Sequence, residues 1–560
     1  MTKKDRLIYL PLGGAGEIGM NCYVYGYGPA GKERLIIVDL GVTFPDMDSS
    51  PGVDLILADT GWLADNADRI EAIFITHAHE DHVGALALVW PDLKKPVYAR
   101  KFTAAIAMMK MEEQGQPRDA VHIVQARPER VEAGPFEVQF VPVSHSIPES
   151  SALIIDTPAG RIVHIGDFKL DGSPVVGEPF DPEQWHGIAH EGDGVKVLVC
   201  DSTNVFVEHP GRSEATLAGP LSELIAAQEG MVVATTFASN VARLKTLAEA
   251  GRSAGRTVCL LGRAMKRMTS VAEETGVLSG FPGTVPPEEA AEVSRHKLML
   301  IVTGSQGERR AASAQLSRGR YLGLEMKEGD SFLFSSKTIP GNERGVIRIM
   351  NAYSEMGVDV IDDHDGLYHV SGHANRPDLE AVHDLLRPKI LLPMHGEHRH
   401  LREHVKLGIG KGIAAELAVN GMMVDLTGNE PDVVEYVDSG RTYLDGSVMI
   451  GAMDGVVRDR IRMALNGHVL ATMITDEDDQ PLGDAWVELM GLPETGRSGT
   501  KLSDGIEAEL AEMLSDADDR LLRDDKKLED AVRKIVRQVA MEEIGKKPEV
   551  TVVISRLLVE

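Results

Sequence analysis

Three histidines and one aspartate lie within six consecutive positions, directly after an apolar stretch of the chain. They are His77, His79, Asp81 and His82, and the stretch before them spans residues 71–76. Neutral imidazole and carboxylate groups are the ligands of Zn²⁺ and of related divalent cations. A turn at the end of a strand lets the first pair and the second pair point towards adjacent centres. The spacing therefore predicts a metal site.

Three further candidates come at the ends of other apolar stretches. Asp39, His145 and Asp167 each close a segment rich in Val, Ile or Phe. Catalytic and binding groups of layered α/β folds gather at the ends of strands. We therefore expect these three side chains to join the first four.

The elements that must position these groups can be read from the apolar pattern. Short apolar runs bounded by turn residues predict strands, and residues 158–160 predict a hairpin turn. In the first 200 residues the predicted strands span 34–39, 71–76, 138–143, 151–156, 161–166 and 195–200. This part of the chain is expected to be rich in β-structure.

The rest of the chain changes its pattern twice. From about residue 211 to 362, apolar strands alternate with helical segments, which predicts an α/β layer with a mostly parallel sheet. Residues 366–435 return to a strand–helix–strand–helix order, in which 367–370 is the first strand. A poorly patterned stretch near 436–456 precedes a tail that is expected to be a small folded α+β module.

Composition restricts the classes of function. The chain has 58 Lys and Arg against 86 Asp and Glu, a net charge of -28. This balance disfavours a protein that binds nucleic acid through a broad basic face, or one that binds anionic membrane, but it leaves room for a local cationic pocket. Three cysteines without a CxxC pair indicate a reducing compartment. No apolar run approaches 18 residues, so we expect a cytoplasmic protein without membrane contact.

Residues 14–19 match the GxGxxG pattern of dinucleotide-binding proteins. That pattern needs a helix to follow, so that the helix N-terminus meets the pyrophosphate. Here a strand-like alternation follows from Asn21. We therefore interpret these glycines as a turn between two strands and expect no nucleotide cofactor.

The order HxHxDH, His145, Asp167 resembles the metallo-β-lactamase superfamily, whose fold is an αββα sandwich. The resemblance implies two metal sites. One would be formed by His77, His79 and His145, the second by Asp81 and His82, with Asp167 bridging the two. The motif is specific to the superfamily and not to one reaction. The last metal histidine of the superfamily is best matched by His395, which lies 228 positions after Asp167 and implies a domain inserted between them.

Three further segments, 200–203, 371–374 and 393–396, resemble motifs A, B and C of the β-CASP subfamily, which processes nucleic acids. A histidine in the third motif is the RNA-type variant in that subfamily. Companion segments resemble the bacterial ribonuclease J family along nearly the whole chain: 13–21, 44–46, 235–240, 303–308 and 339–343.

The resemblance implies a domain order and a reaction. The metallo-β-lactamase domain would span 1–208 and 366–438, the inserted β-CASP domain 209–365, a linker 439–456 and the C-terminal α+β domain 457–560. The implied activity is a 5′→3′ exoribonuclease that prefers 5′-monophosphorylated RNA and also cuts internally, in RNA maturation and decay. Two divalent ions per subunit are expected, Zn²⁺ or alternatively Mn²⁺. A homodimer or tetramer and partners in an RNA-degradation complex are also implied.

The resemblance assigns roles to further residues. Asp39 would orient a histidine or the attacking water, and Asp81 would act beside it. His373 would protonate the leaving oxygen or stabilise the transition state, with Asp201 positioning it. A 5′-phosphate pocket would be formed by Ser239, Asn240, His369, Val370, Ser371, Gly372, His373 and Ala374. The alternatives are a DNA nuclease of the same subfamily, a catalytically silent RNA-binding subunit, and a small-ester hydrolase of the same metal fold.

Overall fold

The structure is a computed structural model, which describes residues 5–364 and 366–557. The chain separates into two compact units. One combines Met1–Thr43 with Leu57–Arg441, and the other combines Phe44–Ile56 with Thr442–Glu560.

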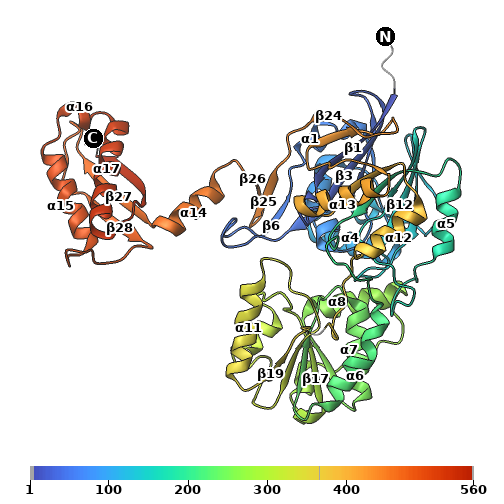
Figure 1. The fold of residues 1–560 in the computed structure, drawn as a ribbon. Coiled ribbons are helices and arrows are strands. Elements are labelled where there is room, and N and C mark those ends of the chain that lie inside the picture. Colours follow the sequence, from blue (N-terminus) through green and yellow to red (C-terminus); the bar gives the residue numbers. More distant parts are fainter. Residues whose placement is uncertain (1–4, 365, 558–560) are drawn as a thin grey trace. The chain divides into compact units, whose positions relative to one another are not determined.

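Two sheets pack face to face in the first unit (Figure 1). The first, the β1 sheet, has the order β24 (Asp432–Tyr436), β23 (Met422–Asp425), β1 (Asp5–Gly13), β3 (Cys22–Pro29), β4 (Arg34–Val38), β7 (Ile70–Phe74), β8 (Val97–Ala99), β9 (Val121–Ile123). The second, the β11 sheet, has the order β10 (Val131–Ala133), β11 (Phe136–Pro142), β12 (Ser151–Thr157), β13 (Gly160–His164), β14 (Val195–Asp201), β20 (Ile390–Met394), β22 (Ala414–Ala415). Tyr9, Phe74 and Phe140 fill the layer between them.

Helices cover the outer faces of both sheets. The helices α5 (Pro182–His190), α12 (Arg376–Leu386) and α13 (His398–Gly410) share a buried apolar cluster with the β11 sheet. On the other side α4 (Lys101–Glu113) packs on β8 and β9. These four layers confirm the predicted αββα sandwich.

The predicted strands of this sandwich are confirmed within a residue or two. The hairpin turn at 158–160 is confirmed too, because Thr157 pairs with Gly160. The glycines of residues 14–19 are followed by the strand β3, which pairs antiparallel with β1. This geometry is the predicted turn between strands and lacks the helix that a pyrophosphate site needs.

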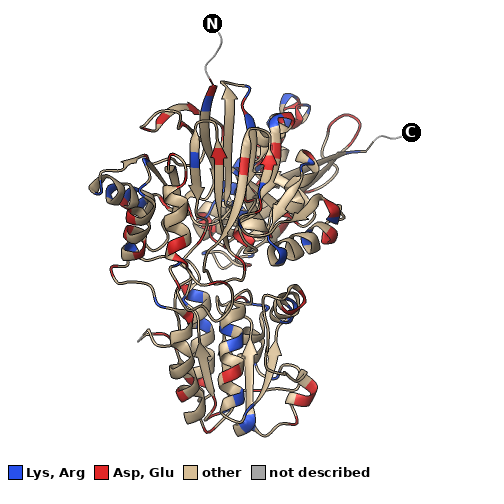
Figure 2. Ribbon diagram, turned by 90° about the vertical axis from the view of Figure 1, so that its right-hand side faces the viewer, with Lys and Arg blue, Asp and Glu red and all other residues tan. Residues whose placement is uncertain are grey.

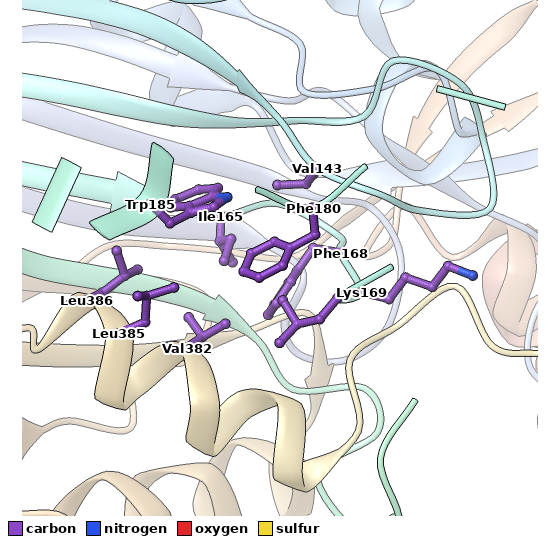
Figure 3. Close-up of a pocket in the computed structure, with 10 residues that line it drawn as sticks. Val143, Ile165, Phe168, Lys169, Phe180, Trp185, Val382, Leu385 and Leu386 are labelled. Carbon is purple, nitrogen blue, oxygen red and sulfur yellow. The ribbon is translucent and has the colours of Figure 1, made fainter. Parts of the chain in front are cut away.

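A small cavity of about 10 Å³ lies between α12, α5 and the β11 sheet (Figure 3). Its walls include Val143, Phe168, Trp185 and Leu386. An apolar space that can hold about one water molecule, without polar partners for it, is a packing gap and not a ligand site.

A third sheet, the β15 sheet, is wholly parallel. Its order is β16 (Thr257–Leu261), β17 (Leu298–Val302), β15 (Val232–Thr235), β18 (Ser331–Phe334), β19 (Asp359–Ile361). Figure 1 shows α11 (Glu343–Glu355) on one side of this sheet, and α6 (Ala218–Ala227) and α7 (Val241–Ser253) on the other. The predicted α/β layer with a parallel sheet is thus confirmed.

One predicted strand is wrong. Residues 367–370 have no strand conformation. Their backbone carbonyls accept hydrogen bonds from side chains instead of a neighbouring strand. Ser335 Oγ and Arg243 Nη1 donate to Tyr368 O, and Arg212 Nη2 donates to His369 O. The apolar pattern predicted the strand because it does not show that side chains satisfy this backbone.

The second unit contains a β-hairpin and an α+β module. The stretch 439–456 carries the antiparallel strands β25 (Arg441–Asp445) and β26 (Val448–Gly451), and α14 (Val456–Asn466) follows. In the module, β28 (Trp486–Met490), β27 (His468–Thr475) and β29 (Glu549–Arg556) form a sheet under α15 (Leu502–Ser515) and α17 (Asp525–Ile544). The predicted strands of the module are confirmed. Among the described residues, no helix has the length and apolar character needed to cross a bilayer.

Candidate metal centre

The predicted donors meet at one edge of the sandwich, where strands from both sheets end. His77 and His79 lie between β7 and the short helix α2 (Glu80–Val83), which carries Asp81 and His82. The remaining donors follow other strands of the two sheets: Asp39 after β4, His145 after β11, Asp167 after β13 and His395 after β20. The sequence spreads these residues over more than 350 positions, and the topology brings them together.

One oxygen atom is the hub of the cluster. Asp167 Oδ2 lies 3.3 Å from His82 Nε2 and 3.5 Å from His395 Nε2. It also lies 3.8 Å from His145 Nε2 and 3.9 Å from His77 Nε2. Four imidazole nitrogens, from three segments of the chain, thus face one buried carboxylate.

The donors fall into two groups whose ligand atoms lie within 4.8 Å of one another. One group is His77, His79 and His145, and the other is Asp81, His82, Asp167 and His395. Either group could hold a divalent cation. The geometry thus brings together all seven predicted ligands, and the assignment of each to a metal ion stays a prediction.

Asp39 orients two of the histidines. Its Oδ2 accepts from His82 Nδ1 at 2.8 Å and from Thr76 Oγ1 at 2.8 Å. Because the Thr76 hydroxyl has one hydrogen and gives it to Asp39, its oxygen accepts from His77 Nδ1 at 3.0 Å. Both Nδ1 atoms are therefore donors, and both Nε2 atoms are directed towards the cluster, as is typical of histidines that bind metal ions.

Asp201 repeats this arrangement on β14. Its Oδ2 accepts from His373 Nδ1 at 2.7 Å, and its Oδ1 accepts from Thr203 Oγ1 at 2.7 Å. The Thr203 oxygen lies 2.9 Å from His395 Nδ1, which donates to it. His395 Nε2 then faces the cluster, 3.1 Å from Asp81 Oδ2.

His145 is fixed by the loop that carries His373. Its Nδ1 donates to Gly372 O at 2.6 Å. A Cβ at Gly372 would come within 2.9 Å of the His145 ring, so this close approach requires glycine. The loop and the metal-type histidine therefore position each other.

Burial and neighbouring charges shift the pKa values in the cluster in different directions. Burial and the surrounding imidazoles hold the pKa of His77 well below its usual range, and burial lowers the pKa of His79 to about 4. For His82, burial is outweighed by the carboxylates of Asp167 and Asp81, which raise its pKa to about 10. The carboxylates around His82 thus favour positive charge at this place in the cluster.

The two aspartates that orient the histidines also differ. Burial raises the pKa of Asp39, although His82 and Thr76 partly offset the effect. Burial acts in the same direction on Asp201, but His373 and His395 hold its pKa well below the usual range. The pKa of His373 is raised, because Asp201 more than offsets the effect of burial.

The residues predicted for a phosphate pocket lie in two loops. Ser239 Oγ is 3.1 Å from His79 Nε2 at the metal-type cluster. Asn240 is buried, and its side chain accepts from Arg243 N to cap α7. Val370 and Ala374 are buried apolar residues, so they can offer backbone groups alone.

Ser371 lies between these buried residues. Its Oγ accepts from Asn204 Nδ2 at 2.8 Å and from His373 N at 3.1 Å. The 369–374 loop is thus held in shape by its own serine and by Asn204.

Sequence reasoning missed three polar residues of this site. Thr76 and Thr203 each bridge an aspartate and a histidine, and Asn21 Nδ2 lies 2.9 Å from Asp81 O and 3.0 Å from His82 Nε2. Thr76 directly precedes the cluster, Thr203 ends the segment 200–203, and Asn21 ends the segment 13–21. Their position in those segments was the available signal.

Four parts of the chain match known families. Residues 15–216 match the metallo-beta-lactamase superfamily, and 229–353 match the beta-CASP domain of ribonuclease J. Residues 366–417 match the Zn-dependent metallo-hydrolase RNA specificity domain, and 455–557 match the ribonuclease J C-terminal domain. Along the chain, the four matches cover the first part of the sandwich, the β15 sheet, the second part of the sandwich and the C-terminal α+β module.

The chain is similar to curated proteins over its whole length. It is 40% identical to ribonuclease J of Sinorhizobium meliloti over 558 residues, which cover 100% of this chain and 98% of that protein. It is 35% identical to ribonuclease J of Mycolicibacterium smegmatis, covering 96% of this chain and 95% of that protein. Ribonuclease J of Helicobacter pylori is 31% identical, with 98% and 79% covered.

A solved structure shares the fold. It is a protein of unknown function from Enterococcus faecalis, with a TM-score of 0.51 and 17% identity, covering 75% of this chain and 100% of that one. At that identity the likeness concerns the fold alone. The full-length relatives and the four matched regions together show that this chain belongs to the ribonuclease J family of metallo-hydrolases.

Proposed function

We propose that the protein is a two-metal ribonuclease that degrades RNA from a 5′-monophosphorylated end and also cuts internally. The observation that carries the proposal is the position of His373. It is held by Asp201 at 2.7 Å, and its Nδ1 lies 4.0 Å from Asp167 Oδ2, at the centre of the metal-type cluster. A proton donor beside two cation sites is the arrangement that phosphodiester hydrolysis requires.

The residues of the cluster fit divalent cations. His77 Nε2 and Asp167 Oδ1 are buried and have no hydrogen-bond partner among the described residues. Buried polar atoms are rarely left without a partner, and a cation would satisfy both. The donors are imidazole nitrogens and carboxylate oxygens, which suit Zn²⁺ and also Mn²⁺. When bound, two such ions lower the pKa of a water molecule and neutralise charge on phosphoryl oxygens.

The chain's own residues would orient the histidines and supply the proton. Asp39 holds His82 and, through Thr76, His77, so that their Nε2 atoms stay directed at the cluster. His373 would give its proton to the departing 3′ oxygen, and Asp201 keeps its ring in place. The products would be a 5′-phosphate on one fragment and a 3′-hydroxyl on the other.

A large cleft beside the cluster supports a polymeric substrate. It measures about 750 Å³ and reaches Glu80, which lies between His79 and Asp81. Its other wall comes from the ends of β15, β16 and β17, and includes Phe237 and Arg263. A small ester would need neither this space nor the paired His373 and Asp201.

The RNA preference and the 5′-end preference are supported by two observations. The region with the His373 loop and His395 matches an RNA specificity domain, and the full-length relatives are named ribonuclease J. Ser239 and the 369–374 loop both lie at the cluster, through contacts with His79 and His145. A terminal phosphate bound there would place the first phosphodiester near the cations.

The test is a time course with end-labelled RNA carrying a 5′-monophosphate or a 5′-triphosphate, compared with DNA of the same sequence. The pair His77→Ala/Asp81→Ala should abolish hydrolysis, whereas His186→Ala, at an exposed histidine on α5, should leave it unchanged. Retained activity in the paired variant would rule out the proposed site. Equal rates for both 5′ ends would remove the end preference, and faster cleavage of DNA would support the DNA nuclease alternative.

A further inference from the structure

We infer that Arg243 is a positioning residue that makes His369 Nε2 a hydrogen-bond donor to the RNA 5′-phosphate. The inference rests on the 5′-phosphate pocket proposed above. It adds a residue that lies outside that pocket and acts through His369.

Arg243 is fully buried on α7, where a charge needs a partner. Its Nε donates to Glu214 Oε1 at 2.5 Å and its Nη2 donates to Glu214 Oε2 at 3.0 Å. This bidentate pair fixes the plane of the guanidinium group and leaves Nη1 to other partners.

The Nη1 atom is directed at Ser335, which directly follows β18, and at His369 of the 369–374 loop. It donates to Ser335 O at 2.8 Å and lies 3.2 Å from His369 Nδ1. A guanidinium has no lone pair to offer, so the Nδ1 atom facing it must be the acceptor. In neutral His369 the proton therefore resides on Nε2.

The surroundings keep His369 neutral. Burial, and then the cations Arg243 and Lys337, hold the pKa of His369 well below its usual range. Among residues 5–364 and 366–557 no hydrogen-bond partner is found for its Nε2, which leaves this N–H free for a ligand. A neutral donor in a field of fixed cations suits an anion such as a phosphate.

The same arginine fixes the backbone that carries His369. Arg243 Nη1 also lies 3.4 Å from Tyr368 O, and Arg212 Nη2 donates to His369 O at 2.7 Å. Ser335 Oγ donates to Tyr368 O at 2.7 Å, so this serine and the two arginines together replace the strand partners that residues 367–370 lack. Arg243 sets both the place of the His369 ring and the direction of its hydrogen bond.

The cations near His369 are local. Lys169, Lys337 and Arg212 all contribute to its lowered pKa, in a chain with a net charge of -28. Figure 2 shows acidic and basic residues interspersed along the helices. Recognition of the RNA end would then depend on this pocket and not on a broad basic surface.

The experiment uses three variants of the full chain. Glu214→Leu/Arg243→Met removes both buried charges together, so that neither is left unpaired. Arg243→Lys keeps the charge but cannot bridge Glu214 and His369. His369→Gln places an amide nitrogen near the position of Nε2, and this donor needs no tautomer to be selected.

We expect Glu214→Leu/Arg243→Met to raise KM for 5′-monophosphorylated RNA about tenfold or more, the effect of one hydrogen bond to a charged group, with kcat changed far less. Arg243→Lys should give an intermediate increase. In the His369→Gln background the paired change should add less than about threefold, because the tautomer no longer matters. Circular RNA has no 5′ end, so its cleavage should fall far less than that of 5′-monophosphorylated RNA in each variant, and the His186→Ala control should leave both unchanged.

An equal KM increase in both backgrounds would overturn the inference, because Arg243 would then serve packing alone. Nitrogen-15 spectra of histidine-labelled protein give a readout independent of activity. The His369 signal, assigned by its loss in His369→Gln, should show the Nε2-protonated tautomer in the unchanged protein but not in the paired variant. A wild-type protein with this tautomer and no preference for a 5′-monophosphate would contradict the proposed function and leave the positioning role intact.

Discussion

Two halves of the site are built on the same plan but differ in exposure. In one, Asp39 holds His82 directly and His77 through Thr76. In the other, Asp201 holds His373 directly and His395 through Thr203. In both halves the threonine N–H also donates to the same aspartate, at 2.8 Å. One motif of aspartate, threonine and two histidines thus occurs twice around Asp167.

The difference lies in the histidine that each aspartate holds directly. The His82 side chain is 1% exposed, whereas that of His373 is 21% exposed. A sealed imidazole suits a ligand, because its lone pair has no competing water. An imidazole open to solvent can exchange its proton after each turnover, which suits an acid. We therefore expect the Asp39 half to serve metal binding alone. We expect the Asp201 half to combine metal binding at His395 with proton transfer at His373.

The largest effect is expected from Asp167→Ala, which breaks both halves at their shared oxygen. Four imidazoles lose their common partner, so both cation sites should be lost and hydrolysis of RNA should fall to background. Metal analysis of the purified variant alongside the rate provides the check. Normal metal content would contradict the idea of a shared hub.

His373→Gln should lower the rate of hydrolysis without changing the metal content, and so distinguish the functions of the two halves. It removes the exposed imidazole, and loss of a general acid costs about 10²–10⁴ in rate. The metal content should not change, because His373 lies outside both predicted ligand groups. Loss of metal together with rate would show that the two halves do not differ in function.

Asp39→Asn tests the half of the site that Asp39 organises. We call it the sealed half because its His82 side chain is only 1% exposed. An amide in place of the carboxylate can no longer accept from both His82 and Thr76, and such outer partners are worth about 10–100-fold in metal affinity or activity. Adding excess Zn²⁺ or Mn²⁺ should restore much of the rate. The matched Asp201→Asn variant should not recover to the same extent, because its main loss is in His373.

The smallest effects are expected from Thr76→Val and Thr203→Val, which keep the volume and remove one hydroxyl each. Each should lower the free energy of unfolding by about 1 kcal/mol, with more if a buried partner is left unsatisfied. Thr76→Val should weaken metal binding more than Thr203→Val does. Thermal unfolding and metal titration of the two variants would test this order, and a reversed order would count against the sealed half as the stronger metal site.

The fold could be predicted from the sequence wherever the residues of a segment determine its own secondary structure. The runs 151–156 and 195–200 are mostly apolar, and they form β12 and β14. Residues 367–370 could not be predicted, because the partners of their backbone, Arg212 and Arg243, lie more than 120 positions earlier. A local pattern does not show which distant side chain will satisfy a carbonyl.

The candidate site also has residues that could be predicted from the sequence and residues that could not. Its donors could be predicted, since four of them stand together within residues 77–82 and the others follow apolar strands. The threonines could not, since a hydroxyl between an aspartate and a histidine is only defined once β7 and β4, or β14 and β20, lie side by side. The ligand assignments and the domain limits stay predictions.

Asp39 and His395, one from each half, have backbone φ angles of 65° and 50°. Only a few per cent of residues other than glycine adopt this left-handed region, and holding a residue there costs roughly 1–3 kcal/mol. His395→Gly should therefore yield a protein that unfolds at a higher temperature than His395→Ala while both are inactive. Selection for stability alone would favour glycine at this position, so the histidine is evidence of a trade in which the native fold accepts conformational strain for the sake of chemistry.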